Sequence, residues 1–165
     1  MKNGLKLNEK GFSLVELIIV IAIMAVLVGV VGTQVIPYME SSKKAKDIQI
    51  LSSYATSGVM AYALHADDAP NDLADNKLII DITSSGGKDV FTARDTRCQR
   101  IADQLKDLIG RDVVTDHENV FESKAFKPTV KITVEYDFTD RTIKVLAIDN
   151  ANVVINANDN IYGRL

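Results

Sequence analysis

Residues 10–16 are Lys-Gly-Phe-Ser-Leu-Val-Glu, and they open an apolar run that continues to about Ile36. No charged residue lies between Leu17 and Gly32, so Glu16 is the one ionisable side chain in this run. A helix of about 20 apolar residues spans the hydrocarbon core of a bilayer. The run is therefore long enough to cross a membrane as a tilted helix.

Glu16 is a residue that a plain membrane anchor would not contain. A carboxylate in hydrocarbon costs about 2.5 kcal/mol or more unless it is paired or reaches the interface. Cleavage between Gly11 and Phe12 would create an ammonium group four residues away. That group is too close along one helix for an easy contact, but a neighbouring copy of the chain could offer its own. The pattern therefore favours self-assembly.

The Gly11-Phe12 junction, Glu16 and the long apolar helix resemble the class III signal of type IV pilins and of the pseudopilins of type II secretion and competence systems. The resemblance implies that a membrane prepilin peptidase cuts after Gly11 and N-methylates Phe12. It also implies that Glu16 meets a neighbour's N-terminus during assembly. The implied partners are further copies in a helical filament, and an inner-membrane assembly platform.

The resemblance implies a structural subunit of a type IV pilus filament, of the kind used in adhesion and motility, and neither an enzyme nor a cofactor carrier. The alternative within the family is a pseudopilin or minor pilin of a type II secretion or DNA-uptake apparatus. The resemblance implies a precursor that crosses the cytoplasmic membrane once, with its basic leader inside and the head outside. For the pilus subunit it then implies an extracellular filament on the cell surface. A membrane-anchored enzyme or ligand-binding domain would need convergent ionisable groups, which the sequence does not indicate.

Two other interpretations of the apolar run fit less well. A secretory signal peptide has an apolar core of about 7–15 residues followed by a small-x-small cleavage site, whereas this run is longer and no such site ends it cleanly. A simple one-pass anchor fits the length but leaves Glu16 unexplained.

Composition limits the remaining classes. The 165 residues suit one domain plus an anchor, and the formal net charge of −3 gives no general attraction for nucleic acid. The single cysteine, Cys98, cannot form an intramolecular disulfide, so the chain lacks the C-terminal disulfide loop of many pilins. Its apolar helical context indicates a small core residue rather than a reactive thiol.

We expect three segments: a leader over residues 1–11, a transmembrane and filament-core helix over 12–36, and a head over 37–165. Gly29, Gly32 and Pro37 weaken the helix near the segment boundary, and we expect a break there on assembly. In the single subunit we expect a helix through both glycines, with a bend at Pro37. Family members usually have a proline slightly earlier, where this chain has Thr33.

The second half of the long helix is predicted to be amphipathic. Apolar residues recur at helical spacing after Tyr38, which predicts one buried face as far as about residue 66. The residues of this expected face are Ile48, Leu51, Ala55, Val59, Tyr62 and Ala66.

An acidic turn then ends the helix. Asp67, Asp68 and Asp72, with Asn71 and Asp75 nearby, are hard oxygen donors of the kind that Ca²⁺ prefers. They lack EF-hand spacing, and acidic turns usually face water, so we expect no metal and keep these residues as weak candidates only. His65 and His117 stand without a Cys, Ser or paired acid at a recognisable spacing, so we expect each to be a surface or boundary residue rather than a catalyst.

The rest of the head predicts an antiparallel sheet. A short strand is expected at 77–82, a loop at 84–87, and a short helix after a capping-box-like segment at 92–95 that stops at Gly110. Strict alternation over 130–138 predicts a half-buried strand, with a partner at 142–148 and a third strand at 153–155. Residues 111–128 are expected to form a loop anchored by Phe121 and Phe126. The expected fold class is α+β, a long helix packed on a small antiparallel sheet.

Overall fold

The computed structural model describes residues 11–157, 159 and 161–165, so the expected leader lies outside the described residues except for Gly11. Two compact units divide the chain, one that ends at Met39 and one from Glu40 to Leu165. The expected α+β class is confirmed, because a long N-terminal helix is followed by an antiparallel sheet of five strands.

Helix α1 (Leu14–Val30) begins directly after Ser13, its N-cap residue. Ser13 has extended backbone angles, and its side chain and that of Glu16 form a reciprocal capping box. The helix buries none of its side chains within the chain. Its apolar surface therefore needs a covering that the described residues do not supply.

A π-helical segment, η1 (Val31–Val35), joins α1 to α2 (Ile36–Leu64). Pro37 cannot donate to the carbonyl four residues earlier, at Thr33, and π turns commonly relieve such a defect. Pro37 is the second residue of α2, but η1 precedes it without a break, so its missing N–H falls inside the continuous helix. The expected continuity through Gly29 and Gly32 is thus seen, with π geometry before the proline.

The head-side part of α2 has a buried face that differs in part from the expected one. Leu51 and Ala55 are buried as expected, whereas Ala66 is exposed and lies beyond the end of α2, in the 3₁₀ turn η2 (Ala66–Asp68). Of the other expected residues, Ile48, Val59 and Tyr62 are only half-buried. The buried face instead consists of Asp47, Leu51, Tyr54, Ala55, Gly58 and Ala61.

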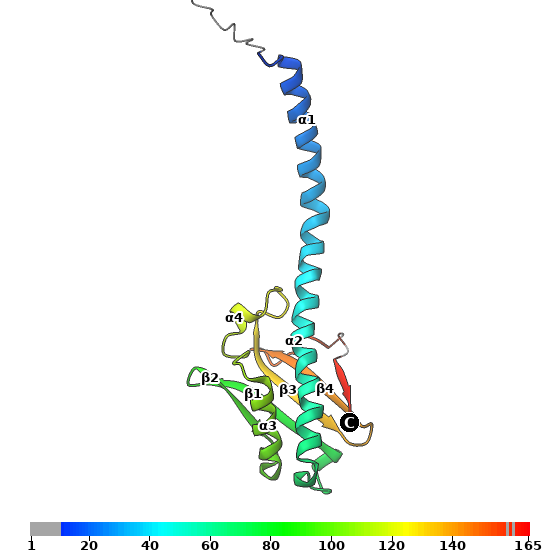
Figure 1. Ribbon diagram of the computed structural model, residues 1–165, viewed down its shortest axis with the longest axis vertical. Helices are drawn as coiled ribbons and strands as arrows, with labels where there is room; N and C mark the ends of the chain where they lie inside the picture. The colour runs from blue at the N-terminus through cyan, green and yellow to red at the C-terminus, as the bar shows by residue number, and fades with distance from the viewer. Residues whose placement is uncertain (1–10, 158, 160) are drawn as a thin grey trace, which may run out of the picture. The chain divides into compact units, whose positions relative to one another are not determined.

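The sheet has the strand order β2-β1-β3-β4-β5, and every neighbouring pair is antiparallel. The central strands are β1 (Lys77–Ser85), β3 (Thr129–Asp137) and β4 (Thr142–Asp149). The edges are β2 (Lys88–Ala93) and β5 (Tyr162–Arg164). Figure 1 shows α2 running across the sheet, and α3 (Gln99–Ile109) lies beside β2.

Glycines allow α2 to approach the sheet closely. Tyr136 Oη donates to the carbonyl of Gly58 at 3.2 Å, and a Cβ added to Gly58 would lie 3.3 Å from Tyr136 Oη. A Cβ on Gly163 of β5 would lie 2.9 Å from Val59 Cγ2, closer than packed atoms allow. The close contact between helix and sheet therefore depends on glycine, which has no side chain, at both positions.

Two strand assignments needed correction. The expected loop at 84–87 is a two-residue turn, in which Gly86 and Gly87 have φ of 61° and 76° and connect β1 to an unforeseen strand, β2. Glycine adopts such angles without strain, which suits a tight hairpin. The strand expected at 153–155 is only an isolated bridge between Ile148 and Val154, and the last strand is β5.

The segment between β2 and β3 also needed adjustment. Thr92 belongs to β2 rather than to a capping box, while Asp95 accepts the Arg97 N–H at 3.0 Å and opens the 3₁₀ turn η4 (Thr96–Cys98) before α3. Gly110 ends α3 in the left-handed conformation, as predicted. A further 3₁₀ turn, η3 (Ala74–Asn76), and the one-turn helix α4 (His117–Val120) complete the elements. Phe121 and Phe126 are buried, as expected.

Candidate functional site

The start of α1 holds three residues that the sequence singled out. Gly11 and Phe12 precede the helix in non-helical backbone, and the Phe12 side chain is 92% exposed. A peptide bond outside regular secondary structure lacks the hydrogen bonds that would hold it away from an enzyme. The Gly11-Phe12 bond is thus sterically open in the described chain.

The capping box explains why the helix does not begin earlier. Ser13 Oγ accepts the Val15 N–H at 3.3 Å, and Glu16 Oε2 accepts the Ser13 N–H at 2.9 Å. Each bond satisfies a backbone donor that a helix start leaves free. The Glu16 carboxylate thus has a partner in its own chain, in addition to any partner from another copy.

This local role of Glu16 was missing from the sequence interpretation. The signal was available, because Ser13 and Glu16 have the Ser-x-x-Glu spacing of a capping box before an apolar run. The burial of its charge accounts only for the partner expected from a neighbouring copy, whereas this spacing also predicts the local bond.

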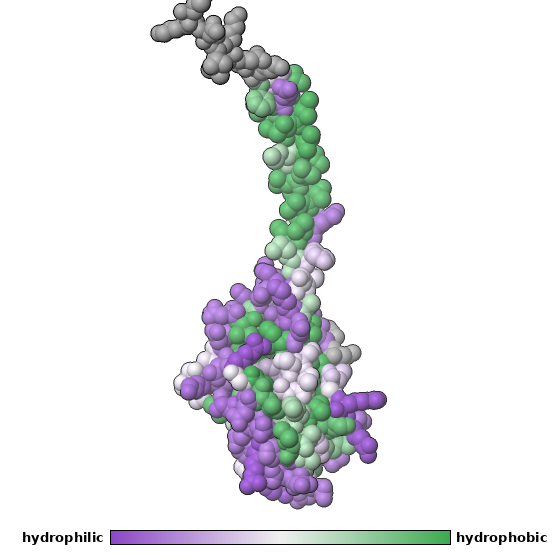
Figure 2. Space-filling view, viewed as in Figure 1, coloured by the Kyte–Doolittle hydropathy of each residue, from purple (hydrophilic) through white to green (hydrophobic). Residues whose placement is uncertain are grey.

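Helix α1 presents an almost uniform apolar surface. Figure 2 shows hydrophobic residues covering the visible face of the segment that follows the start of the helix. Among the described residues, the helix from Leu14 onward is the one that is long and apolar enough to cross a membrane. The same surface would serve equally well for packing against other apolar helices.

The weak part of this helix has a side chain bonded to its backbone. Thr33 Oγ1 donates to the carbonyls of Gly29 at 3.3 Å and Val30 at 3.2 Å, and such bonds from Thr slightly weaken and often bend a helix. Nothing lies within 4 Å of a Cβ placed on Gly29 or Gly32. Both glycines therefore lie at open surface.

Comparison with known families agrees with this geometry. A family model, the prokaryotic N-terminal methylation motif, matches residues 6–32, a span that includes Gly11, Phe12 and Glu16. The chain carries the class III signal peptide of type IV pilins and pseudopilins. No curated protein and no solved structure matched the chain.

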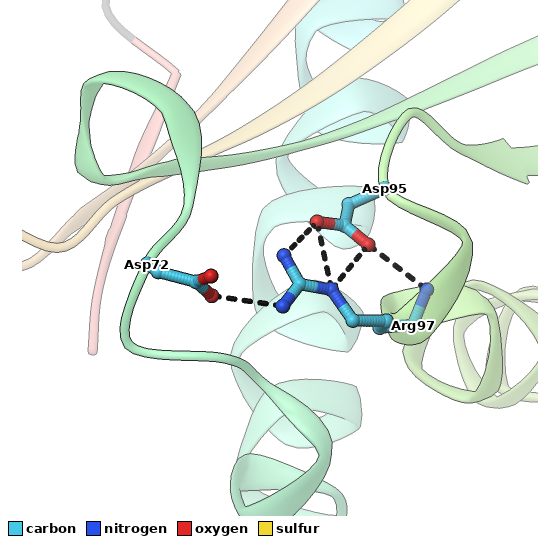
Figure 3. Close-up of polar contacts among 3 residues, drawn as sticks. All are labelled: Asp72, Asp95 and Arg97. Atoms are coloured by element: carbon cyan, nitrogen blue, oxygen red, sulfur yellow. Dashed lines mark hydrogen bonds and ion pairs between the residues drawn. The ribbon is translucent and has the colours of Figure 1, made fainter.

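The acidic turn after α2 is held by arginines. Asp72 accepts from Arg97 Nη1 at 2.8 Å, and the same guanidinium binds Asp95 through Nη2 at 2.6 Å (Figure 3). Asp68 lies 3.4 Å from Arg100 Nη1. Arg97, which pairs with Asp95, holds the pKa of that carboxyl below its usual value.

These ion pairs bear on the weak metal candidates. Asp67 and Asp68 lie in η2, whereas Asp72 points towards Arg97 in Figure 3. Among residues 11–157, 159 and 161–165, no group of three or more His, Cys, Asp or Glu side chains is placed to hold a metal ion. Two of the three carboxylates instead have cationic side chains as partners.

The histidines and the cysteine have structural contacts. His65 Nδ1 lies 3.2 Å from Asp68 Oδ2, and its Nε2 lies 3.4 Å from Gln104 Oε1, so the ring connects the end of α2 to α3. His117 Nδ1 lies 2.9 Å from the carbonyl of Val114. Cys98 is buried, as expected, and desolvation raises the pKa of its thiol. A raised pKa disfavours the nucleophilic thiolate.

The head also has a pocket of about 440 Å³ near the end of α2. Arg141 is the one lysine, arginine, histidine or acidic side chain that lines it; the others are apolar, amide or aromatic, and include Tyr62, Asn76 and Phe138. Acid–base catalysis needs at least one positioned proton donor or acceptor with a suitable pKa. The pocket offers no paired groups of that kind.

Proposed function

We propose that this protein is a structural subunit of a type IV pilus filament, assembled through its N-terminal helix after removal of the leader and N-methylation of Phe12. The observation that carries the proposal is the combination of the methylation motif with a helix that buries no side chain in its own chain. An uncovered helix of this kind requires lipid before assembly and other copies of itself afterwards.

The apolar surface of α1 supplies the driving force in this proposal. Burial of one large aliphatic side chain contributes about 1.5–3 kcal/mol relative to water. Ile18, Ile21 and Val28 are each more than half exposed, and the rest of α1 is similar. Lipid covers these side chains in the precursor, and packing with small residues such as Ala22 and Gly29 would favour close contact between helices in the filament.

Glu16 directs this packing in the proposal. Cleavage after Gly11 produces an ammonium group on Phe12, and a neighbour's ammonium can reach the carboxylate oxygen that the capping box leaves free. An ion pair shielded from water is much stronger than one in solvent. The pair would set the axial position of each incoming copy, because apolar surfaces alone permit sliding.

The segment around η1 is the proposed site of the helix break. Gly29, Gly32 and Pro37 are poor helix formers, and β-branched residues lie between them. The π geometry at Val31–Val35 adds a weaker hydrogen-bond register. We expect this segment to lose its helix when copies pack. A filament density map with unbroken helix from Gly29 to Pro37 would contradict it.

The proposal implies specific partners and locations. A prepilin peptidase would remove the leader and methylate Phe12 in the cytoplasmic membrane, and an inner-membrane platform would add copies to a filament outside the cell. Adhesion or motility would then be functions of that filament. A pseudopilin or minor pilin of a secretion or DNA-uptake apparatus would share every step up to assembly. Abundant surface fibres made mainly of this chain would favour the major pilin.

Two substitutions at one position test the assembly role of Glu16. Glu16→Gln keeps an oxygen for the capping box but removes the charge, whereas Glu16→Val removes both. If the charge pairs with a neighbour's N-terminus, both variants should insert and be cleaved, yet yield few filaments in shear fractions. Wild-type amounts of filament from Glu16→Gln would show that the charge is not required.

A further inference from the structure

The two edges of the sheet differ in length. Strand β5 at one edge has three residues, whereas β2 at the other has six, Lys88–Ala93. An edge strand with free peptide groups is a template for pairing with a strand of another chain. A three-residue edge offers little, so β2 is the edge at which such pairing would begin.

The register shows which peptide groups of β2 point outward. Ser85 and Lys88 pair across the two-residue turn, so alternate residues of β2, beginning at Lys88, bond to β1. The N–H and carbonyl groups of Asp89, Phe91 and Ala93 consequently face away from the sheet. These are the groups that an added strand would use.

The side chain of Gln99 occupies the middle of this edge. Its Oε1 accepts the Ala93 N–H at 3.1 Å, and its Nε2 donates to the Phe91 carbonyl at 2.9 Å. In a parallel pairing, the N–H and the carbonyl of one residue of an added strand would make the same two contacts, to the N–H and the carbonyl that flank Thr92. The Gln99 amide therefore takes the place of a strand.

The orientation of that amide is fixed by its partners. The Ala93 N–H can only donate and the Phe91 carbonyl can only accept, which distinguishes oxygen from nitrogen. The second Nε2 hydrogen goes to Asp103 Oδ1 at 3.0 Å, one turn further along α3. All of the donors of the amide are thus used, and Asp103 holds Gln99 against the edge.

A second side chain covers the turn end of β2. Asp112 Oδ1 accepts the outward N–H of Asp89 at 2.7 Å. In return, the buried Asp89 carboxylate accepts the N–H groups of Val114 at 2.8 Å and Thr115 at 2.7 Å. The chain that follows α3 is thereby fastened to the same edge.

We propose that Gln99, supported by Asp112, closes the β2 edge against strand addition by β2 of a second copy of this chain. The exposed side chains of β2 include Val90 and Thr92, residue types that favour strands, so the edge would otherwise be able to pair with another strand. Closure restricts contact between copies to other surfaces. The inference goes beyond the proposed function, and edge closure does not depend on it.

The test compares three full-length chains purified in detergent: wild type, Gln99→Leu and Lys106→Leu. The control adds the same apolar side chain to an exposed position of α3 whose side chain makes no hydrogen bond to the described residues of β2. We expect the Ala93 amide of Gln99→Leu to exchange with deuterium about tenfold faster at low concentration, since one hydrogen bond is lost. We also expect association that rises with concentration and protects the Phe91 amide.

Two results would overturn the proposal. One is unchanged exchange at Ala93, because the edge would then be closed by something else. The other is faster exchange without any more association than Lys106→Leu shows by light scattering. If Gln99→Leu fails to fold, the same exchange and light-scattering measurements are made on Gln99→Asn. This variant keeps the amide but is one methylene too short to bridge both groups. Leader removal and Phe12 methylation, measured on the same variants in cells, are expected to be normal, so a failure of the proposed function would be visible separately.

Discussion

Helix α1 and the part of α2 within the head have opposite relations to their own chain. No side chain of α1 is buried, and its one ionisable residue is satisfied by the helix start itself. In α2, Asp47 is fully buried, and its carboxylate accepts the N–H groups of Glu122 at 3.0 Å and Ser123 at 2.8 Å. The head is therefore completed by contacts within one chain, whereas the described residues leave the side chains of α1 uncovered.

The largest expected effect lies in the uncovered region. Gly11→Leu places a bulky side chain next to the proposed scissile bond and should abolish leader removal, while insertion continues because the apolar run is unchanged. The size of the membrane-bound chain on denaturing gels measures this. Gly29→Leu is the matched control, because Gly29 faces open space and lies outside the junction. Normal processing of Gly11→Leu would contradict the assignment.

The next effect concerns the buried carboxylate of the head. Asp47→Asn directs an amide donor towards backbone N–H groups and removes the charge, so it should cost about 3 kcal/mol of head stability. Urea unfolding followed by tyrosine fluorescence measures the change. Glu122→Gln, which loses an exposed ion pair with Lys46 at the same contact, should cost less than about 1 kcal/mol. Equal losses of stability in the two variants would contradict the claim that the buried hydrogen bonds of Asp47 stabilise the head more than the exposed ion pair does.

Two glycine substitutions compare the packed head with the uncovered helix α1. Gly163→Ala brings a methyl group against Val59 and the carbonyl of Ala55, and should destabilise the head by about 1–3 kcal/mol through overpacking. Gly29→Ala meets nothing within 4 Å and should leave head stability unchanged. A tolerated alanine at Gly163 would mean that β5 can move away from α2 at little cost.

The smallest effect is a pH dependence on the outer face of the sheet. Burial acts to raise the pKa of Asp81, but bonds from Arg94 and Thr133, with Lys131 nearby, outweigh it and lower the pKa. A carboxyl with a lowered folded pKa contributes stability above its unfolded pKa of about 4, and that contribution is lost as pH falls through the folded pKa.

Asp81→Asn should therefore cost less than about 1 kcal/mol at neutral pH, because the group is partly solvated. It should also flatten the fall in stability below about pH 4 relative to wild type. Urea midpoints measured from pH 6 to pH 3 check this. If the urea midpoint changes with pH by the same slope in both proteins, Asp81 does not contribute to the pH dependence.

The parts of the fold with long, regular patterns could be predicted from the sequence. The uncharged run predicts α1, and strict alternation in 130–138 predicts β3, with β4 expected at 142–148 as its antiparallel partner. The shorter strands lacked such a pattern. Strand β5 has only three residues around Gly163, and β2 depended on recognising Gly86-Gly87 as a hairpin turn rather than a loop.

Polar partners account for the rest of the difference. Asp47 interrupts the hydrophobic pattern of α2, and its partners lie 75 and 76 residues away, so no local rule could place it in the core. The bonds of Gln99 likewise depend on α3 lying beside β2. The capping box at Ser13 and Glu16 is different, because its spacing is local and could have been predicted.

The central claim is that the chain is processed and methylated at Phe12 and then assembles through α1. Mass spectrometry of the membrane and filament fractions tests it most directly. The account predicts a mature chain that begins with N-methylated Phe12 in both fractions. A mature chain that keeps residues 1–11, or that begins at any other residue, would contradict it.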